Sequence, residues 1–393
     1  MTEIRGTKDG DCFKIAFPRR IDSNNALEVE NQIRSITRDV KDRAIVLDME
    51  SLEYISSAGL RVILHVKKMC SALRIVNVRS EIYEILDMTG FTQMLTVEKA
   101  YRVVSVEGCE EIGCGANGKL YRIDQDNVVK VYKRADALAE IQHEREVART
   151  ALVLGIPTAI SYDVVRVGES YGSVFEMLDA HSFSSILDRE PEKLDWCVKE
   201  YVELLKKIHS TVVPSGKLPD MRETGLEWAS FVKDYLPETA GDKLLSLVKA
   251  IPRDDHMIHG DYHTKNLMLQ GDEVLLIDMD TLAVGHPVFE LASMYNAYIG
   301  FYEYGDVDDE PFLGFDLELA KVFWQKTLAA YLDTQDADTL RSVEDKARIL
   351  GYTRLIRRAV RRQTLKTEWG RAEVALWKGE LLSLLEHVDT LIF

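Results

Sequence analysis

The stretch MIHGDYHTKNLMLQGDEVLLIDMD, residues 257–280, decides the fold of most of this chain. A polar loop, His259 to Asn266, precedes two short apolar runs, and the second run ends at Asp278. Asp261 lies five residues before Asn266. A carboxylate can orient a hydroxyl group and accept its proton, whereas carboxylate and amide oxygens bind magnesium. We therefore expect Asp261 to accept a proton and Asn266 with Asp278 to hold a metal ion.

Two neighbours of these residues are expected to support them. Asp280 follows Asp278 by two residues and is a candidate hydrogen-bond acceptor behind the metal ligands. His259 opens the loop, and a structural role in holding it through a hydrogen bond is favoured over a chemical role. The competing interpretation, a polar loop with unrelated acidic residues, is tested by what precedes the stretch.

A glycine-rich segment, IGCGANGKLYRI, lies far upstream and contains Gly113, Gly115 and Gly118. The valines from 103 to 106 predict a strand before it, and residues 120–123 predict another after it. Glycines at this spacing are weak evidence alone, but a dinucleotide-binding turn would be followed by a helix. Strand, glycine turn and strand instead predict a hairpin in which glycines permit conformations denied to other residues and let main-chain N–H groups reach phosphates.

The next segments supply a cation and a carboxylate in the order that a nucleotide site needs. The run VVKVY places Lys130 in an apolar strand, where its ammonium could pair with phosphates. Residues from about 136 to 154 are rich in helix formers and end at a glycine, which predicts one long helix. We expect Glu146 of this helix to pair with Lys130, with Glu140 and Glu144 as rivals on neighbouring turns.

The motifs HGDYHTKN and IDMD resemble those of the aminoglycoside phosphotransferase and choline kinase superfamily, over residues 101 to at least 295. The resemblance implies a two-lobed protein kinase-like fold, ATP and Mg²⁺ as cofactors, and phosphoryl transfer as the reaction. In such a fold FEMLDA is the hinge between the lobes, and backbone groups of Glu176 and Leu178 would meet the adenine. No long activation segment follows Asp280, which favours a small-molecule hydroxyl acceptor over a peptide.

Two side-chain stripes near the C-terminus give opposite indications about that acceptor. Tyr295, Tyr298 and Tyr302 recur at helical spacing, as an aromatic wall for a cationic substrate would, although such stripes are more often core packing. A cationic stripe could instead bind an anionic acceptor or a partner, or pair with the acidic residues 306–310. The stripe consists of Arg354, Arg357, Arg358, Arg361 and Arg362. The sequence leaves the acceptor open.

Residues 1–98 form a separate region of alternating short strands and amphipathic helices. The segment LDMESLEYISSAGLRVIL, followed by EIYEILDMTGF, resembles the STAS domain of anti-sigma factor antagonists. In that family the serine two residues before the glycine is phosphorylated, which makes Ser57, before Gly59, the candidate phosphoacceptor. The alternative is that Ser57 only caps its helix or is a plain surface residue. Ser56 replaces the Asp of many regulated members, whereas Asp22 is present in the expected loop.

Composition limits the remaining function classes. The net charge is −16, and residues 1–98 contribute almost none of it, with 14 basic against 15 acidic residues. This balance argues against binding to nucleic acid, which depends on neutralising phosphates. We expect no membrane span, because no apolar run reaches ~18 residues. The five cysteines form no CxxC pair, which favours a reducing, cytoplasmic location.

Together these features predict an α/β STAS domain at residues 1–98 followed by an α+β bilobal kinase-like domain. Its N-lobe is expected at 101–178 and its largely helical C-lobe at 179–393. The predicted function is ATP-dependent phosphoryl transfer to a small-molecule hydroxyl, with the STAS domain as a regulatory module or protein-binding site. Two alternatives are a regulatory protein kinase acting on a STAS serine, its own Ser57 or a partner's, and a noncatalytic nucleotide-binding scaffold.

Overall fold

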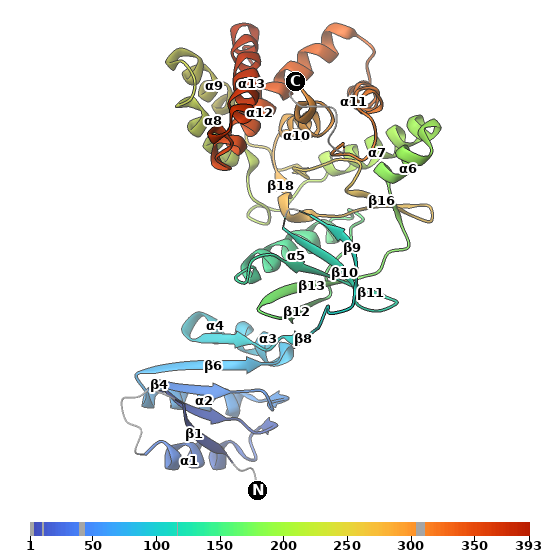
Figure 1. Ribbon diagram of the computed structural model, residues 1–393. Helices are drawn as coiled ribbons and strands as arrows, with labels where there is room; N and C mark the ends of the chain where they lie inside the picture. The colour runs from blue at the N-terminus through green and yellow to red at the C-terminus, as the bar shows by residue number, and fades with distance from the viewer. Residues whose placement is uncertain (1–3, 10–11, 39–43, 116, 304–310) are drawn as a thin grey trace. The chain divides into compact units, whose positions relative to one another are not determined.

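The computed structural model describes residues 4–9, 12–38, 44–115, 117–303 and 311–393 (Figure 1). The chain divides into two compact units. The first contains residues 1–108 together with 164–172, and the second contains 109–163 together with 173–393. Each unit is considered by itself below.

The first unit is built on a five-stranded sheet of order β1-β2-β4-β6-β7. Its strands are β1 (Arg5–Asp9), β2 (Cys12–Ala16), β4 (Ala44–Asp48), β6 (Ala72–Val78) and β7 (Thr96–Lys99). β1 pairs antiparallel with β2, and the remaining pairs are parallel. Short strands β3 (Arg20–Ile21) and β5 (Tyr54–Ile55) pair with each other, and β8 (Arg102–Val103) pairs with β12 (Asp163–Val167).

Helices of the first unit bury one apolar stripe each against this sheet. They are α1 (Ala26–Ile36), α2 (Ser57–Met69), α3 (Ser80–Met88) and α4 (Phe91–Met94). In α1 the buried residues Ala26, Val29 and Ile33 recur at helical spacing. α1 and α2 lie side by side, and their apolar residues join those of the strands in one core. The α/β STAS architecture expected from the alternating pattern is confirmed.

Ser56, not Ser57, caps helix α2. The Ser56 Oγ accepts a hydrogen bond of 3.2 Å from the N–H of Ala58, which satisfies one of the free amides at the helix start. Ser57 is the first helical residue and is exposed. Its hydroxyl makes no hydrogen bond within the residues that the structure describes. The alternative in which Ser57 caps the helix is therefore wrong, whereas its exposed position is compatible both with a plain surface residue and with a phosphoacceptor.

The second unit begins with strands β9 (Glu110–Cys114), β10 (Gly118–Arg122) and β11 (Asn127–Tyr132), which form an antiparallel sheet beside β13 (Ser170–Glu176). Helix α5 (Leu138–Val153) follows β11, as the sequence predicts. The expected strand at residues 103–106 is displaced. Only residues 102–103 are a strand, and the strand that enters the glycine turn starts at Glu110.

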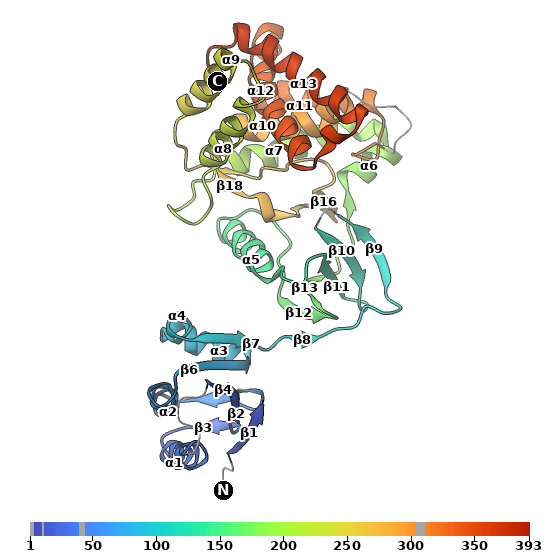
Figure 2. The same ribbon diagram turned by 60° about the vertical axis from the view of Figure 1, so that its left-hand side comes forward.

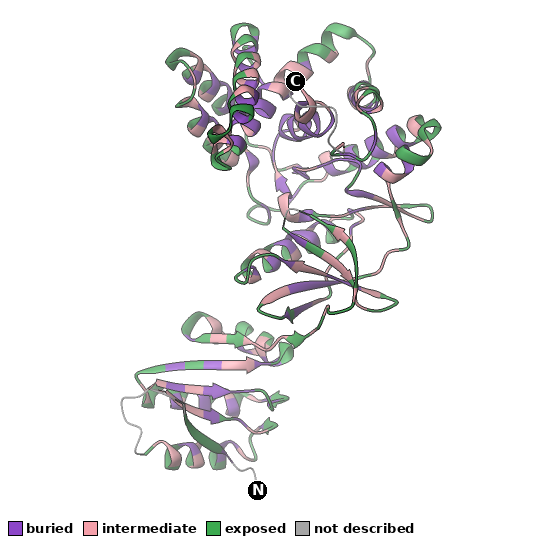
Figure 3. Ribbon diagram, viewed as in Figure 1, coloured by how far each residue is buried: buried purple, intermediate pink, exposed green. Residues whose placement is uncertain are grey.

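The rest of the second unit is mostly helical, and Figure 2 shows these helices gathered in one mass. The helices are α6 (Phe183–Arg189), α7 (Leu194–His209), α8 (Met221–Lys233), α9 (Glu238–Ala250), α10 (Val288–Tyr298), α11 (Leu317–Leu332), α12 (Ala337–Arg361) and α13 (Glu368–His387). Single 3-10 turns lie at Pro191–Lys193, Met279–Thr281, Gly300–Tyr302 and Thr364–Lys366. Every residue of α10 is buried, which makes it the central helix (Figure 3).

Small strands position the functional loop within this unit. β14 (His181–Ser182), β16 (Leu267–Gln270) and β17 (Glu273–Leu276) form one sheet, and β15 (Met257–Ile258) pairs with β18 (Ala283–Val284). The polar loop lies between β15 and β16. The α+β kinase-like architecture is thus the one expected. In the described part of the chain no helix is both long and apolar enough to cross a membrane.

Candidate active site

The ammonium of Lys130 holds two carboxylates together. Its Nζ lies 2.9 and 3.1 Å from the two carboxylate oxygens of Glu144 and 3.3 Å from Oδ1 of Asp278. The hydroxyl of Tyr132 also contacts Glu144. Burial alone would lower the pKa of Lys130, but the charges of Asp278 and Glu144 raise it above its ordinary value. Lys130 is therefore a permanent cation in this site.

The expected pairing of Lys130 with Glu146 is wrong. Glu144 is buried, at 7% exposure, whereas Glu146 is exposed on another face of α5. The reason is helical periodicity, because Glu144 lies three residues after the buried Ile141 and four before the buried Ala148. The position of Glu144 on the apolar stripe of α5 could have identified it, rather than Glu146, as the partner of Lys130.

Glu290, a buried carboxylate of α10, holds the polar loop through hydrogen bonds. Glu290 is fully buried, and its side chain accepts hydrogen bonds from the backbone N–H groups of His259 and Gly260, the latter at 3.0 Å. Burial raises the pKa of Glu290, but contact with His209 and with these donors lowers it below its usual value. Glu290 was not expected from the sequence, although a glutamate within the apolar run VFELA could have indicated it.

Gly260 meets a steric requirement at the same point. Its φ is +81°, and a Cβ atom there would lie 2.7 Å from the carbonyl oxygen of Thr281. Thr281 in turn donates a hydrogen bond of 2.8 Å from Oγ1 to the carbonyl of His259. Only glycine combines that backbone conformation with so close an approach. The loop and the segment after Asp278 are thereby fixed to each other.

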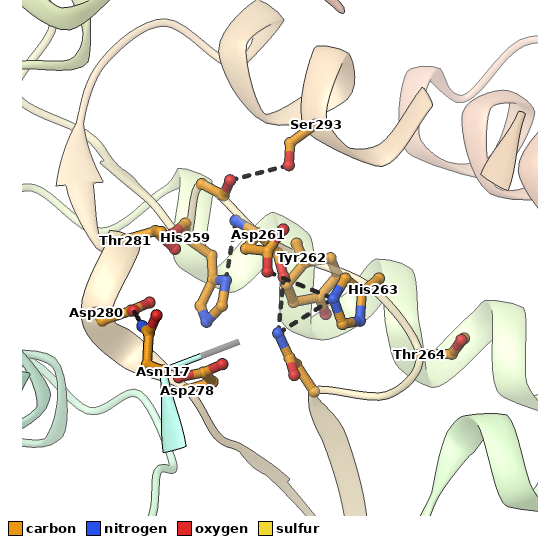
Figure 4. Close-up of polar contacts among 12 residues, drawn as sticks. Asn117, His259, Asp261, Tyr262, His263, Thr264, Asp278, Asp280, Thr281 and Ser293 are labelled. Atoms are coloured by element: carbon orange, nitrogen blue, oxygen red, sulfur yellow. Dashed lines mark hydrogen bonds and ion pairs between the residues drawn. The ribbon is translucent and has the colours of Figure 1, made fainter. Parts of the chain in front are cut away.

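Asp261 lies at the centre of the loop (Figure 4). Its backbone N–H donates to Nδ1 of His259 at 3.3 Å, its carbonyl accepts from the Asn266 amide at 3.0 Å, and its Oδ2 lies 3.5 Å from Nε2 of His263. Burial raises the pKa of Asp261, but the hydrogen bond from His263 and the charges of His263 and Arg354 lower it to about 2. Its side chain keeps 38% exposure, so a substrate could reach it. His259 holds the loop, as expected.

The residues expected to bind magnesium fit a divalent cation. The amide nitrogen of Asn266 is used by Asp261, which leaves its Oδ1 as a ligand. Asp278 adopts a left-handed backbone, with φ +60°, and its side chain is 43% exposed. Within the described residues no group of three or more His, Cys, Asp or Glu side chains forms a complete metal site. Magnesium commonly takes one or two protein oxygens and completes its shell with phosphates and water.

Asp280 shows that negative charge accumulates here. Its Oδ2 accepts a hydrogen bond of 2.9 Å from the amide of Asn117 (Figure 4). Burial raises the pKa of Asp280 most, the charge of Asp278 adds to the increase, and Lys130 opposes it, with a result of about 7. A bound cation would relieve this excess of carboxylates, which is the second reason that the site fits one.

The glycine hairpin depends on one of its three glycines. A Cβ atom at Gly118 would lie 2.4 Å from the carbonyl oxygen of Val131, whereas Gly113 and Gly115 have room for one. None of the three has a positive φ. The backbone conformations that only glycine permits are thus not adopted here, and the close approach of β10 to β11 is the constraint at Gly118. At the expected hinge the Met177 N–H donates to the carbonyl of Asp126 at 2.7 Å, and the adenine contacts of Glu176 and Leu178 remain a prediction.

The tyrosine stripe is core rather than an acceptor wall. Tyr295 and Tyr298 of α10 are 2% and 0% exposed, and the ring of Tyr298 stacks on Phe323. Tyr302 accepts a hydrogen bond from the N–H of Leu313. The structural alternative is thus the correct one. Residues 306–310, considered as partners for the arginine stripe, lie outside the described residues.

Comparisons with known proteins bear on both units. The model of the phosphotransferase enzyme family matches residues 108–317, and the STAS domain model matches residues 4–104. Two crystal structures of aminoglycoside phosphotransferase APH(4)-Ia show the same fold at a TM-score of 0.50. One, a thermostable mutant in apo form, is 13% identical and covers 71% of this chain and 94% of its own. The other is 14% identical and covers 71% and 93%.

The N-terminal region also has a curated relative. The candidate anti-sigma factor antagonist BtrV of Bordetella bronchiseptica is 32% identical over 81 residues. This match covers 20% of this chain and 69% of BtrV. The STAS domain is thus supported by the sheet, by the family model and by an individual relative.

The accumulated negative charge predicts a measurable titration. The pKa of Asp280 is about 7 in the folded chain against an ordinary value of 3.8, so its contribution to stability is present below about pH 4 and is lost as pH rises to 7. ¹³C NMR of the Asp280 carboxyl group should show a midpoint near 7. Asp278→Asn should lower that midpoint, and the exposed Asp272→Asn should leave it unchanged. A midpoint near 4 in the wild-type chain would contradict the described electrostatics.

Proposed function

The chain belongs to the phosphotransferase enzyme family through residues 108–317 and carries a STAS domain of the anti-sigma factor antagonist type, and on that premise we propose that it transfers the γ-phosphoryl group of ATP to a hydroxyl group of a small molecule. The observation that carries the proposal is the position of Lys130, whose ammonium contacts both Glu144 and Asp278. An ammonium held between a helix glutamate and a carboxylate that can bind a metal ion is the arrangement that kinase-type phosphoryl transfer uses.

Asp261 is the residue that would act on the acceptor. With a pKa of about 2 it is ionised at neutral pH, so it is a weak base but a constant hydrogen-bond acceptor. In a loose transition state for phosphoryl transfer, little proton transfer is needed early, and orientation of the hydroxyl matters most. The contacts of Asp261 with His259, His263 and Asn266 fix that orientation.

The nucleotide would be held by three parts of the second unit. Lys130 would pair with phosphates, the hairpin of Gly113, Gly115 and Gly118 would cover them, and Asn266 with Asp278 would hold Mg²⁺. The ion supplies charge neutralisation between the phosphate oxygens and these side chains. Asp280, which accepts a hydrogen bond from the Asn117 side chain, would help to position Asp278.

A second candidate function has one observation in its favour. Ser57 is exposed, and its hydroxyl is free of hydrogen bonds within the described residues, so a STAS serine of this chain or of a partner could be the acceptor. A phosphate there would meet the free N–H groups at the start of α2. In either case the STAS domain would be the site for protein partners. The free cysteines suit a reducing compartment such as the cytoplasm.

The proposed reaction predicts the outcome of an acceptor screen. ATP consumption by the purified chain should rise with particular hydroxyl compounds, and Asp261→Asn should lower kcat by at least about 10²-fold, the loss expected when the acceptor hydroxyl is no longer correctly oriented. Phosphopeptide mapping of the same reactions identifies transfer to Ser57 if the second candidate is correct. Nucleotide binding without ATP consumption, in every reaction with the wild-type chain, would leave only a scaffold and sink the proposal.

Two glutamates of one helix provide a matched test of the Lys130 contact. Glu144→Gln removes a buried carboxylate from Lys130, so kcat/KM for ATP should fall by at least about tenfold, equivalent to a 1.4 kcal/mol loss. Glu146→Gln, two residues along on the exposed face, should stay within about twofold of wild type. Steady-state kinetics with varied ATP provides the measurement. Equal effects of the two substitutions would show that the buried pair does not position Lys130 for catalysis.

A further inference from the structure

We propose that the acceptor carries an anionic group, a phosphate or a carboxylate, which arginines of α12 bind beside Asp261. The inference rests on the proposed function and assigns its substrate class. It concerns the arginine stripe, defined as Arg354, Arg357, Arg358, Arg361 and Arg362, which the nucleotide site leaves unused. Four observations lead to it.

The first is that α12 is fixed to the loop of Asp261. The Arg354 Nη1 donates to the carbonyl of Gly260 at 3.0 Å and to Oγ of Ser293 at 2.7 Å. Ser293 itself donates to the carbonyl of Gly260 at 2.9 Å. Since Gly260 directly precedes Asp261, the arginine stripe starts next to the residue that would orient the acceptor hydroxyl.

The second observation is an aromatic bridge from the loop to the next turn of α12. The guanidinium of Arg358 lies 5.0 Å from the ring centre of Phe301, which is 5.4 Å from Phe312. Phe312 in turn packs edge-on against His263, at 5.1 Å. The Lys265 ammonium lies 5.4 Å from the ring centre of Phe312. The rings of Phe301 and Phe312 thus lie between the guanidinium of Arg358 and the ammonium of Lys265, next to the loop of Asp261.

The third observation is that the described residues neutralise the positive charge of the stripe poorly. No residue of the arginine stripe has an ion pair within 4.0 Å among the described residues. The acidic groups that act on Arg357 and Arg358 through their charge are Glu227 for the former and Asp261 with Glu373 for the latter. Burial raises the pKa of Glu373 to about 7, so its charge is only partly present at neutral pH. Burial and the charges of Arg362 and Arg354 lower the pKa of Arg358, as expected where like charges crowd.

The fourth observation is the exposure of the cations. Arg358, Arg361 and Arg362 are exposed, and Arg354 and Arg357 are half-buried. Guanidinium groups bind carboxylates and phosphates in two-point geometry, so an exposed set beside a reacting carboxylate suits an anionic ligand. The same charges would repel a polycation. The acceptor therefore differs in charge from the aminoglycosides that give the structural relatives their name.

Inorganic phosphate is the probe that tests this inference without knowledge of the acceptor. The full-length chain is first saturated with AMP-PNP and Mg²⁺, which occupies the proposed nucleotide site. Phosphate is then titrated at constant ionic strength by calorimetry. The double variant Arg358→Gln/Arg361→Gln removes exposed cations of the stripe. Arg341→Gln removes an exposed arginine near the other end of the same helix and serves as the control.

The wild-type chain and Arg341→Gln should bind phosphate with dissociation constants within about twofold of each other, and the double variant should bind at least about tenfold more weakly. Equal binding by all three proteins, no phosphate binding, or tight binding of the polycation kanamycin to the wild-type chain would overturn the inference. A further variant, with Asn or Gln at the four acidic positions of residues 306–310, tests whether these acids neutralise the stripe. If it bound phosphate tenfold more tightly than wild type, the stripe would be neutralised by the chain itself, which also overturns the inference.

The same samples separate this inference from the proposed function. Stabilisation by AMP-PNP and Mg²⁺, followed by thermal unfolding, reports the nucleotide site in each variant. If that stabilisation is absent from the wild-type chain, the proposed function fails first. If it is present in every protein while phosphate binding does not depend on the arginines, only the anionic acceptor is refuted.

Discussion

The second unit depends on the ion pairs that the partly buried ammonium of Lys130 makes with two carboxylates. Lys130 is 20% exposed and contacts a buried glutamate of α5 and an exposed aspartate that follows β17. Removing the buried Glu144 would leave the Lys130 charge poorly solvated, which costs on the order of 3–5 kcal/mol for a fully buried pair. Solvent screens the contact with the exposed Asp278, which contributes less. These contacts therefore fix the strand of Lys130, helix α5 and Asp278, the candidate metal ligand, relative to one another. They also leave the ammonium next to the exposed Asp278 carboxylate.

A second set of contacts fixes the polar loop to the helical part of the same unit. Glu290 accepts the N–H groups of two loop residues, and Tyr201 and Tyr262 exchange hydrogen bonds through their hydroxyl and carbonyl groups at 2.8 and 2.9 Å. These groups are buried, so each hydrogen bond also prevents the cost of an unsatisfied polar atom. The loop can then present Asp261 in one orientation, which is the preorganisation that catalysis by positioning requires.

The sequence predicted the parts whose chemistry is local. The spacing of Asp261, Asn266 and Asp278 and the strand around Lys130 required only neighbouring residues, and the structure brings them together. It did not predict strand β1, RGTKD, because an exposed edge strand lacks the apolar alternation that identifies strands. Glu144, Glu290 and the steric role of Gly118 depend on tertiary packing. Helical periodicity could have indicated the first, whereas the contact of Gly118 with Val131 is set by the pairing of β10 with β11.

The central claim is that nucleotide phosphates and a divalent cation meet beside Lys130, at Asn266 and Asp278. Manganese electron paramagnetic resonance tests it most directly, because Mn²⁺ replaces Mg²⁺ at oxygen ligands and its free and bound forms are distinguishable. We expect the wild-type chain to bind Mn²⁺ tightly only when AMP-PNP is present, and we expect Asp278→Asn to abolish this binding while Asp272→Asn preserves it. Equal Mn²⁺ binding by the wild-type chain and Asp278→Asn, or Mn²⁺ binding that does not depend on the nucleotide, would refute this cation site.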